Sequence, residues 1–138
     1  MVVYDVEIVN PVDSGNVAKM EGIETYAKDW NDYLGMGISV IGIYDYKIDQ
    51  YYGLCGDNED DMKLAQELIS QAEVLIGFNN LKFDNPLVRA FGIDAKDEIS
   101  YDILRQLWFG NGLTEVFNPK THGGYNLDAV AKVNTGHH

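Results

Sequence analysis

The first apolar segment of the chain, residues 2–9, has an alternating pattern that predicts a strand with two different faces. Successive side chains of a strand point to opposite sides, so Tyr4 and Val6 share one face while Asp5 and Glu7 share the other. The surrounding residues are mostly Val and Ile, which is typical of a strand at the centre of a sheet. Two neighbouring carboxylates in such a place cost several kcal/mol unless a cation lies between them. A hard divalent cation is the usual solution.

The pattern of the next residues predicts a hairpin and a helix. Residues 36–46 are apolar and alternate, and residues 47–54 suit a hairpin partner, which would give three antiparallel strands. The acidic run 57–61 supplies an N-cap and a negative first turn, and apolar positions spaced by three and four continue the helix to Ile69. This run lacks the ligand spacing and central glycine of a calcium loop, so we interpret it as a helix start.

The second half predicts alternating short strands and helices. Residues 73–78 form an apolar strand, and an Asn-rich turn, a helix at 84–90, a strand near Ile99 and a helix at 103–108 follow. Residues 24–33 suit either a short helix or a loop. Strands and helices in this order predict an α/β domain with a mixed sheet.

Composition limits the classes of protein that fit. With 138 residues, 46% of them hydrophobic, the chain is expected to be one domain, 1–138. It has no run of about 18 apolar residues and no signal-like start, so we expect a cytoplasmic protein with no membrane partner. The single Cys55 fits a reducing compartment. The net charge of −12 argues against ordinary electrostatic binding of nucleic acid. It leaves open an enzyme that meets phosphate through metal ions held by carboxylates.

A second group of polar residues follows the strand at 73–78. Asn80, Phe83 and Asp84 lie within five positions, where α/β folds tend to present ligand-binding groups. If this strand lies beside the first, Asp84 can complete a carboxylate cage with Asp5 and Glu7. Asn80 could then bond a phosphate or sugar, and Phe83 could stack on a base. The structural alternatives are a turn-stabilising Asn80, a core Phe83 and a helix-capping Asp84.

These two groups resemble a known family. The sequence DVE of residues 5–7 resembles the first motif, and NLKFD of residues 80–84 the second, of the DEDD 3′→5′ exonucleases, which have a ribonuclease H-like fold. The resemblance is closest to the proofreading domains of family B DNA polymerases, including protein-primed phage enzymes, and to related stand-alone exonucleases. Residues 101–104 and 125–131 also resemble connecting segments of those domains. The resemblance implies a ribonuclease H-like mixed sheet with flanking helices.

The resemblance also implies a site and a substrate. Two Mg²⁺ or Mn²⁺ ions would be bound, with Asp5 bridging both, Glu7 binding one and positioning the water, and Asp84 binding the other. The substrate would be the 3′ end of single-stranded DNA or RNA. We expect a bacterial or phage-encoded protein.

The fourth carboxylate of that family has no counterpart here. The expected pattern is YxxxD or HxxxxD, whereas two residues separate Tyr125 from Asp128 and five separate His122 from Asp128. Asp102 and Asp128 are candidate replacements, although helix capping is the favoured interpretation of both. Tyr125 or His122 could act as a general base if their loop folds over the site.

Three hypotheses follow from the missing third motif. The chain is a 3′→5′ exonuclease domain that lacks its final helix through C-terminal truncation; or it is a catalytically incomplete binding or assembly module; or it is one part of a split nuclease, with the helix supplied by a partner chain.

Overall fold

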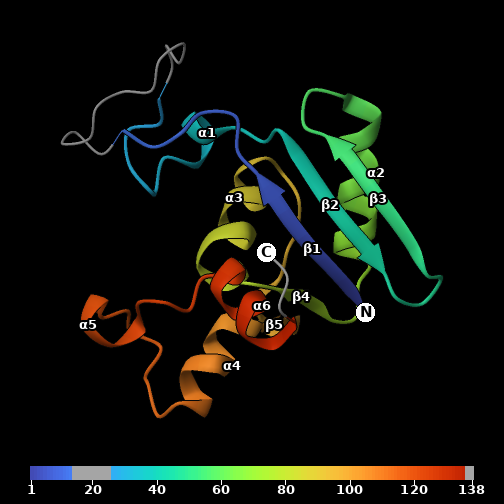
Figure 1. The fold of residues 1–138 in the computed structure, drawn as a ribbon. Coiled ribbons are helices and arrows are strands. Elements are labelled where there is room, and N and C mark those ends of the chain that lie inside the picture. Colours follow the sequence, from blue (N-terminus) through green and yellow to red (C-terminus); the bar gives the residue numbers. More distant parts are fainter. Residues whose placement is uncertain (14–25, 136–138) are drawn as a thin grey trace.

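A five-stranded mixed sheet organises the chain (Figure 1). This computed structural model describes residues 1–13 and 26–135, with side chains to residue 132. The strand order is β3-β2-β1-β4-β5, so β1 (Val2–Glu7) lies in the centre. It pairs antiparallel with β2 (Val40–Asp45) and parallel with β4 (Leu75–Gly77). The predicted α/β fold with a mixed sheet is confirmed at this level.

The two faces of β1 differ as the alternation predicts. Tyr4 and Val6 are buried, whereas Asp5 and Glu7 are exposed on the other face. Because β2 and β4 flank β1 on either side, the acidic pair is not on an edge strand. The third antiparallel strand, β3 (Gln50–Cys55), pairs with β2 as the hairpin prediction required.

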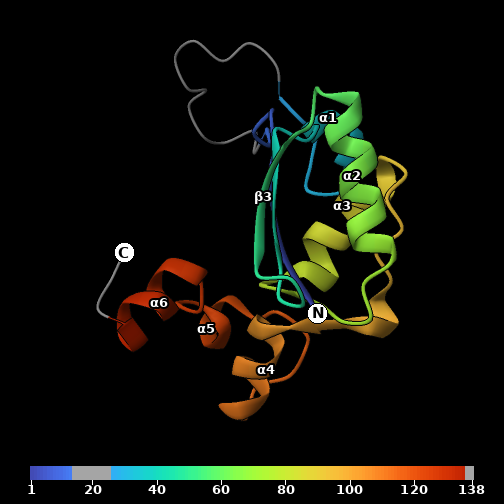
Figure 2. The ribbon, with the colours of Figure 1, turned by 90° about the vertical axis from the view of Figure 1, so that its right-hand side faces the viewer.

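Two helices cover the face to which Tyr4 points. Figure 2 shows α2 (Glu59–Ser70) and α3 (Asn85–Ala90) on the same side of the sheet. The Asn58 side chain caps α2 by accepting the N–H of Asp61 at 3.0 Å, so the predicted acidic helix start is confirmed. The core lies between this face and these helices, and its fully buried members include Ile41, Ile69, Leu75 and Leu87.

The start of the second strand was predicted too early. Residues 33–36 form the short helix α1 (Tyr33–Met36), which Asp32 caps by accepting the N–H of Gly35. Gly37 ends it with a φ of 66°, a conformation that glycine adopts at little cost, and β2 begins only at Val40. Of the segment 24–33, residues 24 and 25 lie outside the described part. The rest before α1 is a turn and a bridge between Val12 and Ala27, so the loop alternative holds there.

The remaining elements complete the far edge of the sheet. The 3₁₀ turn η2 (Asp97–Ile99) leads into β5 (Ser100–Asp102), which pairs parallel with β4. The chain continues into α4 (Ile103–Gly110) and α5 (Pro119–His122). The last helix, α6 (Leu127–Thr135), stands on the opposite side of the sheet from α2 and α3 (Figure 2). In the described ranges, no helix combines the length and the apolar character needed to cross a bilayer.

Candidate metal centre

The predicted carboxylates lie towards the carboxyl ends of β1 and β4. These strands are parallel neighbours, so their carboxyl ends lie at the same end of the sheet. Asp84 is only 3% exposed. Burial, followed in decreasing order by repulsion from Asp5, Asp102 and Glu7, raises its pKa to about 8. The structure therefore brings Asp84 into electrostatic contact with both members of the acidic pair, and with Asp5 most strongly.

One oxygen of the buried Asp84 carboxyl is left without a partner. Its Oδ2 atom is buried without a hydrogen-bond partner, and its side chain makes no capping hydrogen bond to α3. Asp84 therefore occupies the N-cap position of α3 without capping the helix through its side chain. All three charged neighbours that shift its pKa are themselves carboxylates. A buried carboxyl in such a field either keeps its proton or binds a cation.

The carboxylates do not form a closed cage. Across residues 1–13 and 26–135, no three His, Cys, Asp or Glu side chains lie close enough together to hold one metal ion. Like charges with no cation between them are expected to stay apart. The arrangement offers one buried and two exposed all-oxygen ligands, which suits Mg²⁺ or Mn²⁺ in chemical type.

Asn80 lies beside Asp84 in a short π-helix, η1 (Asn80–Asp84), a conformation often found at functional sites. It is fully buried, and neither its Nδ2 nor its Oδ1 atom has a partner. The interpretation of Asn80 as a stabiliser of its own turn is therefore wrong. Gly77 allows this packing, because a Cβ at that position would lie 2.6 Å from the Asn80 Cβ.

Asp102 organises the same turn from the end of β5. Its carboxylate accepts the N–H groups of Asn79 at 2.9 Å, Leu81 at 3.3 Å and Leu104 at 3.0 Å. The last of these caps α4, which confirms the capping interpretation. The other two bonds fix the backbone of the residues before and after Asn80. Sequence reasoning missed this role of Asp102 because these partners are more than 20 residues away from it. These bonds occupy Asp102, so it is a poor replacement for the fourth ligand.

Phe83 is half-buried and packs against the core, as its structural alternative predicts. Trp30 lies edge-on to it, with ring centroids 6.2 Å apart and planes at 70°. Trp30 is 64% exposed, which makes it the more accessible aromatic surface of the pair. Sequence analysis missed Trp30 because it lies in an irregular segment with no hydrophobic period.

Asp128 does not cap the helix that contains it. Asn126 caps α6, since its Oδ1 accepts the N–H of Ala129 at 2.8 Å. Asp128 is exposed in the first turn of the helix. Its capping interpretation is therefore wrong by two residues.

His122 is buried in an aromatic cluster away from the solvent. Its Nδ1 accepts the N–H of Asn118 at 3.1 Å, and its Nε2 lies 2.9 Å from the Thr114 carbonyl, to which it can donate. The ring also packs edge-on against Trp108 at 4.6 Å. With both nitrogens engaged, His122 is not available as a general base. Tyr125 is half-buried just before α6.

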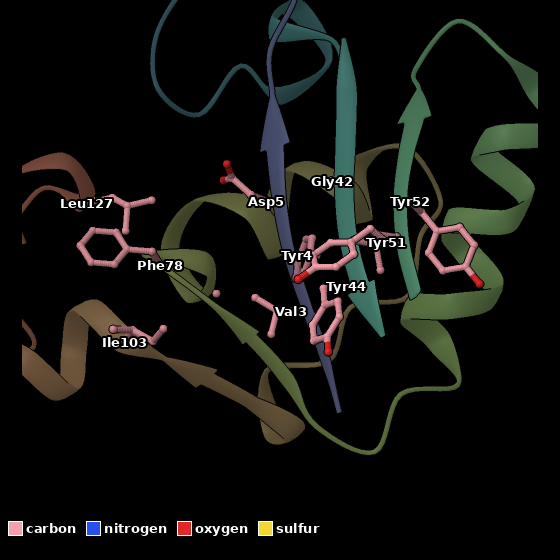
Figure 3. A pocket seen from close by; sticks show the side chains of 12 residues that line it. Val3, Tyr4, Asp5, Gly42, Tyr44, Tyr51, Tyr52, Phe78, Ile103 and Leu127 are labelled. Carbon is pink, nitrogen blue, oxygen red and sulfur yellow. The ribbon is translucent and has the colours of Figure 1, made fainter. Parts of the chain in front are cut away.

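An apolar hollow of about 340 Å³ opens on the face of the sheet that carries Asp5 (Figure 3). Side chains of Tyr44 and Tyr51 line one end, and Phe78 and Leu127 line the other. Between them, the neighbour of Asp5 on β2 is Gly42. A Cβ at Gly42 would meet only the Asp5 carbonyl, at 4.0 Å, so the sheet surface is bare beside the acidic pair.

Comparison of the chain with protein-family models finds no matching family, and comparison with curated proteins finds no match.

Proposed function

We propose that this chain is a metal-dependent 3′→5′ exonuclease domain that hydrolyses phosphodiester bonds of single-stranded nucleic acid. The observation that carries the proposal is the buried Asp84 carboxyl, whose Oδ2 atom has no hydrogen-bond partner and whose pKa is raised by burial and by the neighbouring Asp5. Placing these groups together destabilises the metal-free protein, so their arrangement makes physical sense if a cation binds there.

The fold supports the same proposal. A central strand carries the acidic pair, two antiparallel strands lie on one side of it, and two parallel strands lie on the other. This is the kind of mixed sheet that the resemblance to ribonuclease H-like exonucleases implies. The segment NLKFD follows the parallel neighbour of the central strand, so it lies at the same end of the sheet as the segment DVE, which supports the proposal.

Each proposed residue has a distinct part. The exposed carboxylates of Asp5 and Glu7 would hold divalent ions from the solvent side, and Asp84 would hold one from the buried side. Bound ions of this kind activate a water and stabilise the leaving oxygen of a phosphodiester. The unpaired amide of Asn80, fully buried in this structure beside Asp84, would bond a phosphate or sugar that reaches this end of the site. Trp30 with Phe83 offers an aromatic surface for a base.

The test is degradation of a 5′-labelled single-stranded oligonucleotide with Mg²⁺ or Mn²⁺. Asp5→Asn and Asp84→Asn should each abolish stepwise shortening from the 3′ end. Glu67→Gln is the matched control, because it neutralises an exposed carboxylate on α2. Wild-type activity that persists unchanged in both site variants would reject the proposal.

A second candidate is a catalytically incomplete binding module, or one part of a split nuclease. The observation that favours it is the lack of a closed three-ligand group among the residues described. The hollow beside Asp5 suits a helix from a partner chain, because a glycine in a strand permits close approach of another backbone. Such a helix could supply the fourth carboxylate.

Metal titration separates the two candidates. The exonuclease should bind two Mn²⁺ ions and shorten the oligonucleotide. The incomplete module should bind one ion weakly and show no turnover at any Mn²⁺ concentration.

A further inference from the structure

A buried hydrogen bond joins the residues next to two of the proposed ligands. The Tyr4 hydroxyl donates to the Asn85 Oδ1 atom, across 81 positions of sequence. Tyr4 precedes Asp5 on β1, and Asn85 follows Asp84 at the start of α3. Both side chains are almost completely buried, Tyr4 at 2% exposure and Asn85 at 0%.

Asn85 is itself held from the other side. Its Nδ2 donates to the Ser100 Oγ at 2.8 Å and to the Asp97 Oδ1 at 3.1 Å. Arg89 binds the same Asp97 oxygen at 2.8 Å, which fixes that carboxylate. The Asn85 amide therefore has partners on both its oxygen and its nitrogen, and it links β1, α3 and the start of β5.

Burial keeps this hydrogen bond in place. Tyr4 and Asn85 are 2% and 0% exposed, so water does not compete for either partner. A tyrosine ring on β1 has little freedom once its hydroxyl is bound and its face packs in the core. The start of α3 is thus attached to β1 one residue away from Asp5.

We propose that Tyr4 and Asn85 are positioning residues that set the separation of the Asp5 and Asp84 carboxylates, and so the affinity of this pair for a divalent cation. The inference rests on the proposed function, because it assumes that the pair binds metal. Tyr4 and Asn85 lie outside the two segments DVE and NLKFD. Tyr4 would contact neither the metal ion nor the substrate, and it would act through Asn85.

The experiment measures Mn²⁺ binding to the folded protein by calorimetry, well below the unfolding temperature. Tyr4→Phe removes only the hydroxyl and should weaken Mn²⁺ binding about tenfold, the loss expected when the supporting contacts of a metal site are removed. Tyr46→Phe is the matched control, because it removes the hydroxyl of an exposed tyrosine in the turn that follows β2. It should change the affinity less than about twofold.

A second control separates positioning from general loss of stability. Ile69→Val trims a fully buried side chain of α2 and should lower stability without changing Mn²⁺ affinity. If Tyr4→Phe does not fold, Ser100→Ala removes one anchor of Asn85 and should give a smaller loss of affinity in the same direction. If the wild type binds Mn²⁺ and Tyr4→Phe or Ser100→Ala binds it with the same affinity, the inference is wrong and the proposed function is unaffected. Absence of Mn²⁺ binding in the wild type overturns both.

Discussion

Neutralising Asp84 should stabilise the metal-free protein, and the gain should grow with pH. The folded state raises the pKa of this carboxyl from 3.8 to about 8. Between these values the folded protein holds a proton that the unfolded chain has lost, so wild-type stability falls as pH rises from about 4 to about 8. Below about pH 4 the carboxyl is protonated in both the folded and the unfolded state. Above about pH 8 the buried carboxylate is charged, and its whole destabilising effect on the folded state is present.

The magnitude follows from the same two values. A difference of about four pH units corresponds to an upper limit of about 6 kcal/mol, at about 1.4 kcal/mol per pH unit. Water penetration and relaxation around a buried ion reduce such costs, so we expect about 2–4 kcal/mol at pH 9. Asp84→Asn keeps the shape of the protonated side chain, and so at pH 4 it should differ from the wild type by less than about 1 kcal/mol.

Urea denaturation of both proteins from pH 4 to pH 9, without divalent ions, measures this difference. Glu67→Gln provides the control, since it neutralises an exposed carboxylate on α2 instead of a buried one. Millimolar Mn²⁺ should then raise wild-type stability above pH 7 and leave Asp84→Asn unchanged, because a ligand that binds only the folded state stabilises it. A stability difference that stays constant with pH, or that increasingly favours the wild type, would refute the argument.

Three further substitutions test the surroundings of Asp84 by urea denaturation. Gly77→Ala should lower stability by about 1–3 kcal/mol, because its Cβ would lie 2.6 Å from the Asn80 Cβ; an unchanged midpoint would show that the turn can move away. Asn80→Leu should raise stability by about 1–3 kcal/mol by removing two unpaired buried polar atoms, and a loss would mean that they are paired in solution. Asp102→Ala should cost about 2–4 kcal/mol, since three backbone N–H groups lose their acceptor. A smaller effect than that of an exposed Asp60→Ala change would reject the proposed role of Asp102.

Local patterns were sufficient to predict the elements on which the site stands. Alternation predicted that Asp5 and Glu7 face away from the core, because the period of a strand depends on nearest neighbours alone. The acidic run before Met62 predicted the start of α2 for a similar reason, since capping involves residues only three apart. The placement of Asp84 near Asp5 required one additional assumption, that the first and fourth strands are neighbours, and their parallel pairing confirms it.

Other features depend on contacts between distant segments, which no local pattern contains. Asp102 was predicted to cap a helix, but its bonds to Asn79 and Leu81 form only when β5 lies beside β4. The α6 cap was assigned to Asp128 although Asn126 is an equally good capping residue two positions earlier. Sequence reasoning could have found the correct cap by considering both candidates.

The two asparagines that begin and follow η1 show most clearly what the structure adds. Asn80 and Asn85 are the same residue type, five positions apart, and both are fully buried. Asn85 has hydrogen-bond partners on both amide atoms, whereas Asn80 has none. Four buried side-chain atoms in the described part of the chain lack a partner, and three of them belong to Asn80 and Asp84. Each such atom costs about 1–3 kcal/mol, and a fold otherwise well supplied with partners has no structural reason to concentrate that cost beside Asp5. The cost is offset if a cation and its ligands occupy this place, which is why the metal-binding test has priority over any test of nuclease activity.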